Sequence, residues 1–409
     1  MHNVPAVVTP LDDHMGLDIA RSLGCRSIPV YGIDPNPNDA GRTSKYCRFV
    51  ECPDPQVSEQ EYVQFLMDWG KEQENKPVLF PVSDETVQIC SRERTKLLPY
   101  FQFVMPDQRM MFKLASKQGL AEVAEEFHVL APKTLVLRDR HEIEEIAPQL
   151  IFPVILKPVE SSSWHTPEIA AALREDTLGG RAKVVVCHDI EELLKVYQRI
   201  AAYDDRLIIQ EIIPGPDENL TYISFYLNRQ SRPLAIFAGR KLRVLPVGFG
   251  SASYVRSFQD PELEQIAMQF LMNVQYQGLG GLEFKKDVRD GRYKLIEFNT
   301  RFGMWDGLGV FCGVDAPYIA YQDTLSRQVE PQLTYRENVI WVDLQRDFRA
   351  IRIYHQRGDL TLKEWLHSLR GEKMWAVYSR DDWRPGVKWT LGLLKLLWTR
   401  LAGKERYQA

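Results

Sequence analysis

Residues 279–303, LGGLEFKKDVRDGRYKLIEFNTRFG, are the stretch on which the interpretation of the whole chain depends. They contain two runs with the residue types of β-strands, GGLEFKKDV and RYKLIEFNT, separated by Arg289-Asp290-Gly291. An Asp-Gly pair between two such runs is one of the strongest short-range signals for a tight turn. We therefore predict a β-hairpin at this position.

The predicted hairpin carries oxygen-bearing side chains that can converge. Glu283 lies on the first strand, and Glu297 and Asn299 lie on the second. Residues two apart on a strand face the same side, and pairing across the turn can bring Glu283 beside them. Such a set suits Mg²⁺ held jointly with nucleotide phosphates, and Arg301 follows with a fork of donors for a phosphate or carboxylate. The alternative is a solvated edge with ordinary surface acids.

The composition is that of an ordinary globular protein. The chain has 409 residues, enough for two or three domains, with 44% hydrophobic and 26% charged residues and a net charge of −4. This balance gives no reason to expect nucleic acid as a partner. The six cysteines form no C-x-x-C pair, which favours a reducing, cytoplasmic compartment. The N-terminus has no signal-peptide pattern, and no apolar run is long enough to span a membrane.

The N-terminal part alternates strand-like and helix-like segments. Strands are predicted over 4–9, 27–33 and 78–82, with a helix over 16–23, which indicates an open, mostly parallel sheet. The first turn, TPLDDHMG, lacks G-x-G-x-x-G, so a dinucleotide site is disfavoured. The loops at 12–14 and 83–85 would lie at the edge of the sheet where ligands bind, although helix caps explain them equally well.

The middle of the chain holds candidate phosphate contacts. A helix is predicted over 112–129, and a strand over 152–158 ends with Lys157. A lysine that ends an apolar strand needs a partner if it is buried, and the alternative is a lysine whose charge reaches the surface. The loop ESSSWH at 160–165 could fold over phosphates through its backbone N–H groups.

A strand over 206–213, RLIIQEII, could present its last backbone groups to an adenine edge, and the acids of the following PGPDE could bind ribose. Strands over 220–227, 234–243 and 250–256 and a helix over 260–276 then lead into the hairpin. Lys241 and Arg243 share one face of the second of these strands.

In order and spacing, these motifs resemble the ATP-grasp superfamily, and in particular its carboxylate–amine ligases, the branch that includes D-aspartate ligase and the carbamoyl-phosphate synthase large-chain domains. The resemblance covers roughly residues 4–325. It rests on Lys117, on the sequence ILKP at 155–158, which contains Lys157, on QEIIPGPDE at 210–218, on Glu283 and on Glu297-x-Asn299-x-Arg301. Serines and Trp164 stand where many relatives have phosphate-loop glycines, and Ser116 stands where an Asp often precedes the first lysine.

The resemblance implies ATP as cofactor and two Mg²⁺ ions, with Mn²⁺ as a substitute. The nucleotide contacts it implies are, for the phosphates, Lys117, Lys157, Ser161, Ser162 and Ser163; for the adenine, Glu211 and Ile213; for the ribose, Glu218, with Asp217 as the alternative; and, as a further contact, Lys241. Glu283, Glu297 and Asn299 would hold the metal. Lys157 and Arg301 would be catalytic, with Arg301 facing the transferred phosphoryl group or the activated carboxylate.

The implied activity is that of an ADP-forming carbon–nitrogen ligase, which phosphorylates a carboxylate to an acyl phosphate that an amine then attacks. The substrates would be a small carboxylate and an amine, either an amino acid or a peptide. Two other functions remain as alternatives: an ATP-grasp enzyme with a phosphorylated or carbamoyl-type product, and a catalytically weak nucleotide-binding module.

The implied fold is α/β: an open parallel-sheet domain (pre-ATP-grasp, residues 1–110), a two-lobed α+β ATP-grasp domain (111–327, with lobes of about 111–212 and 213–327) and a C-terminal appendage (328–409). In the appendage we predict a strand over 335–344 and a helix over 360–368.

A second amphipathic helix is predicted over 387–402, VKWTLGLLKLLWTRLA, with one polar stripe of Lys388, Gly392, Lys395 and Thr399. It is too short and too charged to span a bilayer. Two alternatives follow: peripheral contact with anionic lipid at the inner membrane surface, or packing on the ligase body or on the other subunit of a homodimer.

Overall fold

The computed structural model describes residues 4–12, 14–137, 140–146, 148, 150–158, 164, 166–173, 184–204, 206–248 and 250–401. The chain forms two compact units. The first comprises Met1–Met111, Pro216–Glu283 and Phe298–Gln408, and the second comprises Phe112–Gly215 and Phe284–Glu297.

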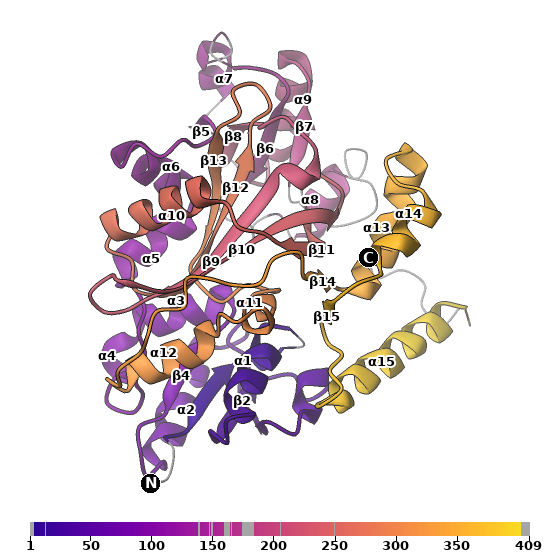
Figure 1. The fold of residues 1–409 in the computed structure, drawn as a ribbon. Helices are drawn as coiled ribbons and strands as arrows, with labels where there is room; N and C mark the ends of the chain where they lie inside the picture. Colours follow the sequence, from indigo (N-terminus) through magenta and orange to yellow (C-terminus); the bar gives the residue numbers. More distant parts are fainter. Residues whose placement is uncertain are drawn as a thin grey trace. The chain divides into compact units, whose positions relative to one another are not determined.

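The first unit contains a four-stranded sheet, of which Figure 1 labels β2 and β4. Its strands lie in the order β3-β2-β1-β4, and every neighbouring pair is parallel. Its strands are β1 (Ala6–Thr9), β2 (Val30–Asp34), β3 (Arg48–Glu51) and β4 (Val78–Pro81). Its helices are α1 (Met15–Gly24), α2 (Glu59–Lys71), α3 (Asp84–Arg92) and α4 (Arg94–Leu97), and η1 (Ala40–Thr43) is a 3₁₀ turn. The predicted open parallel sheet is confirmed. The short edge strand β3 was not predicted, because its residues RFVE show no apolar run.

A seven-stranded sheet follows, in the order β13-β12-β9-β10-β11-β14-β15. Its strands are β9 (Leu220–Leu227), β10 (Pro233–Leu245), β11 (Ser251–Ser257), β12 (Gly278–Lys286), β13 (Tyr293–Asn299), β14 (Ile340–Val342) and β15 (Lys373–Trp375). The predicted hairpin is confirmed as β12 and β13. Its turn closes with a 2.8 Å hydrogen bond from Gly291 N to Asp287 O, and Gly291 has φ +72°, which glycine adopts without strain.

The last part of the chain contributes to this sheet through β14 and β15. The strand predicted over 335–344 is shorter than expected because Asp343 caps the next helix, α13 (Leu344–Arg357), and accepts hydrogen bonds from Gln345 N and Arg346 N at 3.1 Å. The helix predicted over 360–368 is confirmed as α14 (Leu362–Ser368), which begins with a capping box at Thr361. The remaining helices of the first unit are α10 (Pro261–Asn273), α11 (Gly307–Cys312), α12 (Ala316–Thr324) and α15 (Trp383–Leu401), and η4 (Asp217–Asn219) is a 3₁₀ turn.

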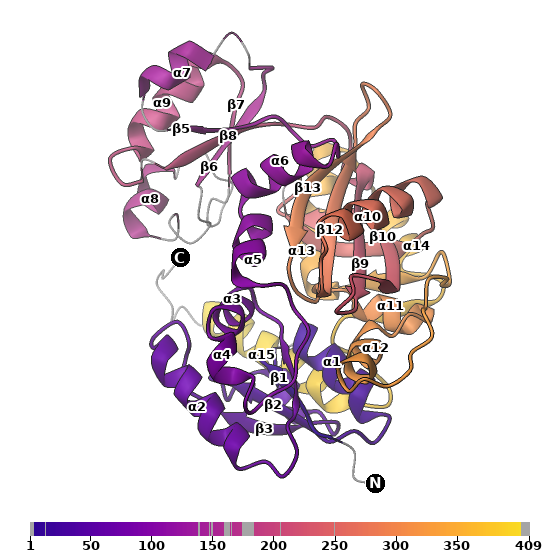
Figure 2. The ribbon, with the colours of Figure 1, turned by 90° about the vertical axis from the view of Figure 1, so that its left-hand side faces the viewer.

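The second unit is built on an antiparallel sheet in the order β5-β8-β6-β7 (Figure 2). Its strands are β5 (Thr134–Leu137), β6 (Val154–Pro158), β7 (Val185–Cys187) and β8 (Leu207–Glu211), and its helices are α6 (Lys117–Glu126), α7 (Arg140–Ile146), α8 (Pro167–Ala172) and α9 (Ile190–Ile200). Apolar side chains from the sheet and from α7, α8 and α9 share one core, which also contains Trp164.

The single helix predicted over 112–129 is wrong in one respect. The chain forms two helices, α5 (Gln108–Ala115) and α6, with a break at Ser116. Ser116 has an extended backbone (φ −84°, ψ 143°), and its hydroxyl accepts a 3.0 Å hydrogen bond from Gly119 N. The serine therefore acts as a helix cap, which makes Lys117 the first residue of α6.

Candidate active site

Lys157 is a buried cation near the end of β6. The residue is 7% exposed, and its Nζ donates a 2.7 Å hydrogen bond to Oε1 of Gln210 on β8. Gln210 is itself held by Thr134 Oγ1 at 2.8 Å. Burial, together with the charge of Lys117, lowers the pKa of Lys157 well below its ordinary value. The alternative of a lysine whose charge reaches the surface is therefore wrong.

The partner of Lys157 is neutral, and that is its distinctive feature. Among the residues that the structure describes, its hydrogen-bond partner is the Gln210 amide, and no carboxylate forms an ion pair with it. The Glu297 carboxylate acts on Lys157 only from beyond ion-pair distance, and a buried ammonium without a counter-charge in direct contact is costly. An anion such as a phosphate would remove that cost.

Lys117 and Glu297 form an ion pair in the second unit. Lys117 Nζ lies 2.7 Å from Glu297 Oε1, with the lysine side chain 20% and the glutamate side chain 41% exposed. A predicted phosphate contact is therefore paired with a predicted metal ligand. Asn299 lies two residues beyond Glu297 on the same strand, so that the two positions share a face of β13.

Lys241 and Glu283 form a second pair of the same kind, in the first unit. Lys241 on β10 donates to Glu283 Oε2 on β12, and the two side chains are only 8% and 13% exposed. Again a predicted nucleotide contact neutralises a predicted metal ligand.

Arg243 has a different partner from Lys241. The ladder between β10 and β11 is irregular between Lys241 and Arg243, and Arg243 binds Asp347 on α13 through two hydrogen bonds of 2.7 and 2.8 Å. Ser253 Oγ and Trp365 Nε1 also donate to Asp347, at 3.0 and 2.8 Å. The carboxylate is fully satisfied, so this pair is part of the core.

Arg301 forms the predicted pair of hydrogen bonds through its guanidinium group, and its partner is a carboxylate of the protein itself. Its Nε and Nη2 lie 2.6 and 3.1 Å from the two oxygens of Asp84, the first residue of α3. Ser83 caps α3 together with Thr86, which confirms the capping interpretation of the loop at 83–85 for that serine. Asp84 is 67% exposed on its side chain, so a bound carboxylate or phosphate can compete for the arginine.

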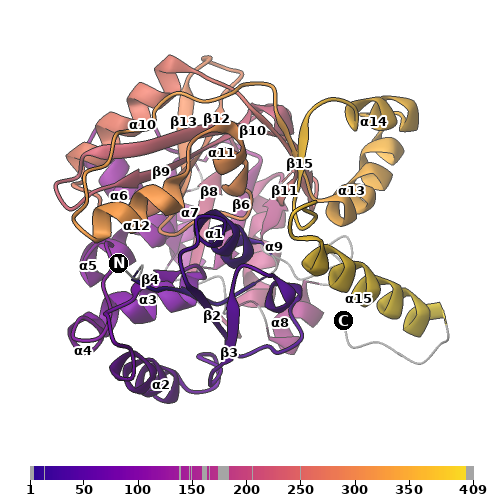
Figure 3. The same ribbon diagram turned by 60° about the horizontal axis from the view of Figure 1, so that its bottom comes forward.

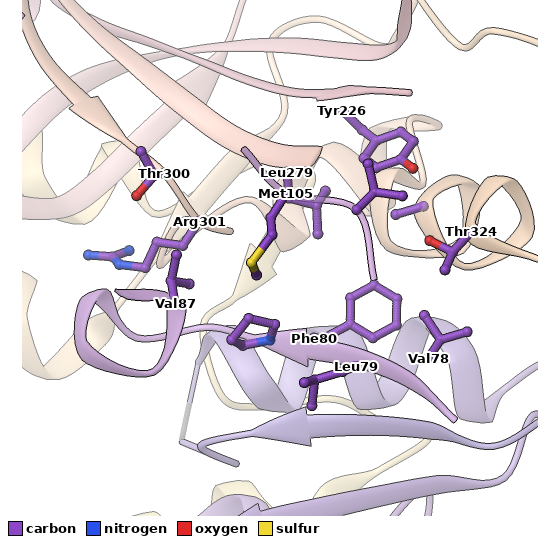
Figure 4. A pocket seen from close by; sticks show the side chains of 13 residues that line it. Val78, Leu79, Phe80, Val87, Met105, Tyr226, Leu279, Thr300, Arg301 and Thr324 are labelled. Atoms are coloured by element: carbon purple, nitrogen blue, oxygen red, sulfur yellow. The ribbon is translucent and has the colours of Figure 1, made fainter. Parts of the chain in front are cut away.

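A small cavity of about 30 Å³ lies beside Arg301, as Figure 4 shows. Its walls are mostly apolar and include Phe80, Met105 and Tyr226, and the Arg301 guanidinium points away from them. The volume accommodates about two water molecules. The cavity is therefore too small to hold an amino-acid substrate.

The expected adenine contacts lie at the end of β8. Glu211 accepts a hydrogen bond from Arg289 in the hairpin turn and a 3.2 Å bond from Lys133 N, and Ile213 is 4% exposed. Arg289 also binds Asp287, which Lys294 contacts at 2.7 Å. Arg289 and Lys294 hold the pKa of Asp287 well below its ordinary value. This turn was predicted only as a connection between two strands, and no sequence pattern indicated its charge network.

The two expected ribose ligands differ. Asp217 accepts a 2.6 Å hydrogen bond from the hydroxyl of Tyr354 on α13, whereas the Glu218 side chain is exposed. Glu218 is thus the more accessible of the two carboxylates. Ser161, Ser162 and Ser163 lie outside the described residues. Trp164 belongs to the core of the second unit, where it is 2% exposed.

The loop at 12–14 caps α1. Asp12 accepts hydrogen bonds from Gly16 N at 2.6 Å and His14 N at 3.2 Å, whereas Asp13 lies outside the described residues. The His14 side chain is 16% exposed and contacts Asp343, with Nε2 3.4 Å from Oδ2. Hydrogen bonding to Asp343 raises the pKa of His14 although burial opposes it.

Two buried carboxyls, which no sequence motif indicated, lie where α1 meets α11. Asp18 and Asp306 are 5% and 3% exposed, and a Cβ atom on Gly307 would lie 2.1 Å from Asp18 Oδ2. Burial raises the pKa of Asp18 and of Asp306 to about 7. The absence of a side chain on Gly307 leaves room for the Asp18 carboxyl group.

This chain is 26% identical over 288 residues to the D-aspartate ligase of Enterococcus faecium (strain Aus0004), an alignment that covers 68% of this chain and 66% of that ligase. The chain thus spans just under two thirds of the relative's length. The crystal structure of L-amino acid ligase from Bacillus licheniformis superposes with a TM-score of 0.59 at 14% identity, covering 80% of this chain and 76% of that one. The chain has the ATP-grasp fold.

The predicted resemblance to ATP-grasp ligases is therefore confirmed. No protein-family model matches the chain. Another structure with this fold, the biotin carboxylase domain of 2-oxoglutarate carboxylase from Hydrogenobacter thermophilus, superposes with a TM-score of 0.62 at 16% identity, covering 83% of this chain and 74% of that one. It contains magnesium ADP and bicarbonate.

The metal assignment in this chain stays a prediction. Within the described ranges there is no group of three or more His, Cys, Asp or Glu side chains placed to hold an ion. The predicted set of two glutamates and one asparagine has the oxygen donors that Mg²⁺ prefers. Both glutamates are paired with lysines, so a metal ion would have to replace those ammonium groups. No described helix is long and apolar enough to cross a membrane.

Proposed function

We propose that the chain is an ATP-dependent carboxylate–amine ligase, which forms an amide through an acyl phosphate and releases ADP and phosphate. The observation that carries the proposal is Lys157, a buried ammonium with a neutral partner at 2.7 Å on the strand where an ATP-grasp enzyme is expected to bind phosphate. The similarity to D-aspartate ligase supports this class of reaction.

The proposed reaction needs charge neutralisation more than acid–base chemistry. A carboxylate oxygen of the substrate attacks the γ-phosphorus of ATP, and ADP leaves. The amine nitrogen then attacks the carbonyl carbon, and phosphate leaves with that carboxylate oxygen. Lys157 and Lys117 stabilise the negative charge on the phosphates by positioned electrostatic contact. Arg301 orients the carboxylate or acyl phosphate through the two donors that bind Asp84.

The proposed metal ligands are Glu283, Glu297 and Asn299. Mg²⁺ bound with ATP supplies charge neutralisation at the phosphates. Lys241 and Lys117 now form ion pairs with the two glutamates, so an ion held by Glu283 and Glu297 would displace two ammonium groups of this chain. Those ammonium groups would then be available to the phosphates.

A screen of carboxylate and amine pairs for ADP release tests the proposal. A productive pair should release ADP only when ATP, carboxylate and amine are all present, and an amide should appear in equal amount. The screen should include acidic and neutral amino acids of both configurations. ADP release with a carboxylate alone, unchanged by any amine, would contradict the proposal and support the alternative of a phosphorylated product.

A further inference from the structure

The C-terminal helix α15 presents a continuous apolar stripe to solvent. Trp383, Val387, Leu391 and Leu394 are 59%, 46%, 60% and 55% exposed. Their spacing of i, i+4, i+8 and i+11 places them on one side of the helix. Large apolar side chains that are exposed in a row, rather than scattered singly, indicate an interaction surface.

Another side of α15 is fixed to its own unit. Pro385 and Gly386 are buried, Lys388 Nζ donates a 2.9 Å hydrogen bond to Asp39 O, and Thr390 Oγ1 lies 2.8 Å from the hydroxyl of Tyr378. Figure 3 shows the rest of the helix extending away from the parallel sheet of that unit.

Lys388 of the predicted polar stripe therefore contacts the protein, whereas the apolar stripe faces outward. Pro385, Lys388 and Thr390 hold the first part of α15 against the rest of its unit, so the exposure of the stripe does not come from a detached helix.

The charge of α15 identifies the partner that fits this stripe. Residues 383–401 contain four basic residues, Arg384, Lys388, Lys395 and Arg400, and no acidic residue. Arg384 and Lys395 are exposed and follow directly after the stripe residues Trp383 and Leu394. A second copy of the same helix would bring basic residues together, whereas an anionic surface complements them.

We propose that α15 binds anionic lipid and lies in the plane of the membrane surface. The apolar stripe enters the region between headgroups and acyl chains, and Arg384 and Lys395 stay among the anionic headgroups. The 19 residues of α15 form a helix about 28 Å long, which gives an extended contact along the surface. The binding is peripheral and reversible, and it depends on salt.

Vesicle co-sedimentation of the full chain tests this assignment. Vesicles of phosphatidylcholine with about a third phosphatidylglycerol should bind the protein at low salt, and pure phosphatidylcholine vesicles should bind it at least about tenfold more weakly. Raising the salt to about 0.5 M should weaken binding to the anionic vesicles. No binding to anionic vesicles at low salt would overturn the proposal.

Variants separate the two components of binding. Leu391→Gln with Leu394→Gln should reduce partitioning by about tenfold or more, because two apolar side chains lose their favourable transfer. Arg384→Gln with Lys395→Gln should reduce it on anionic vesicles only. The matched controls are Val57→Gln with Val288→Gln, at residues 84% and 59% exposed, and Lys71→Gln with Arg109→Gln, which remove the same charge elsewhere. Both control proteins should bind like the original chain.

The oligomeric state in solution tests whether a second copy of the chain, rather than lipid, covers the apolar stripe of α15. The molar mass in solution, measured by light scattering without lipid, should be the same for the original chain and for the Leu391→Gln, Leu394→Gln protein. A dimer that dissociates in this variant would mean that a second copy covers the stripe, and this would overturn the lipid assignment. Equal circular dichroism of all variants would show that lost binding does not come from lost folding.

Discussion

Arg243 and Lys157 are both buried basic residues on strands, and the difference between them separates structure from function. Arg243, 5% exposed, shares a carboxylate that accepts hydrogen bonds from three side chains. Lys157, 7% exposed, has a single neutral amide as its partner in the described part of the chain. The first charge is compensated within the fold, whereas the second is available for an anion. The charge of the hydrogen-bond partner, rather than the burial of the basic residue, therefore identifies the candidate phosphate contact.

The largest expected effect is that of Lys157→Met. We expect kcat/KM for ATP to fall by about 10³-fold, because a positioned charge that contacts phosphate is lost in both the ground and the transition states. The free energy of unfolding should not fall, because an uncompensated buried charge is removed. Steady-state kinetics and urea unfolding check this prediction, and a clear loss of stability would place Lys157 with Arg243 as a structural cation.

Arg243→Met is the reciprocal experiment. We expect unfolding to become easier by about 3–5 kcal/mol, because Asp347 keeps its charge in a buried position without its cation. Among molecules that stay folded, KM for ATP should change little. The double variant Arg243→Met, Asp347→Leu should recover part of the stability, and unchanged urea midpoints in the single variant would contradict the assignment.

Glu297→Gln tests the pairing of metal ligand and lysine. We expect kcat to fall on the order of 10²-fold or more, because the proposed ion loses a charged ligand, while the circular dichroism spectrum stays the same. Glu122→Gln on α6, at an exposed position that contacts only Gln118 among the described residues, is the matched control. Turnover close to that of the original chain in folded Glu297→Gln protein would exclude this residue as a metal ligand.

These comparisons show how far sequence reasoning reaches. The strand at 220–227 and the hairpin were predicted with correct positions, because a run of aromatic and β-branched residues and an Asp-Gly turn are local signals. The break at Ser116 was missed because capping competes with a helical pattern that continues on both sides. The partner of Arg243 lies 104 residues away on a helix that was not predicted, so no local pattern could identify it.

The same limit applies to the candidate site. The sequence placed Lys117, Lys241, Glu283, Glu297 and Arg301 among the site residues. The pairing of Lys117 with Glu297 and of Lys241 with Glu283 nevertheless depends on tertiary contacts between distant segments. Asp84 was a candidate only through its position at the C-terminal end of a strand. Its two bonds to Arg301 span 217 residues and became evident only in the structure.

The buried carboxyls of Asp18 and Asp306 should make stability depend on pH. Their folded-state pKa values, raised to about 7, mean that the folded protein binds more protons than the unfolded chain between about pH 4 and 7. The free energy of unfolding should therefore fall, on the order of 4 kcal/mol for each carboxyl, as pH rises through this range. Arg21, His14 and Asp12 also act on Asp18, and Arg301 acts on Asp306.

Urea unfolding at pH 5.5 and pH 8 checks this dependence, and Asp18→Asn provides the contrast. The asparagine is neutral at both pH values, so the variant should lose less stability on going to pH 8. A pH dependence as steep as that of the original chain would show that Asp18 does not titrate in this range.

The smallest expected effect is that of Asp84→Asn. Because Asp84 is mostly exposed, the loss of its ion pair with Arg301 should change the free energy of unfolding by less than about 1 kcal/mol. The apparent KM for the carboxylate substrate should fall a few-fold, because the arginine no longer has a competing protein carboxylate. A higher KM would instead assign Asp84 to positioning Arg301.

Oxygen transfer from the substrate carboxylate tests the central claim most directly. With a carboxylate labelled by ¹⁸O in both oxygens, the acyl-phosphate route moves one labelled oxygen into the inorganic phosphate for each amide formed. The account predicts ¹⁸O in phosphate alongside equimolar ADP, detected by ³¹P NMR or mass spectrometry. Label in AMP with release of pyrophosphate, or amide formation without label in phosphate, would contradict it.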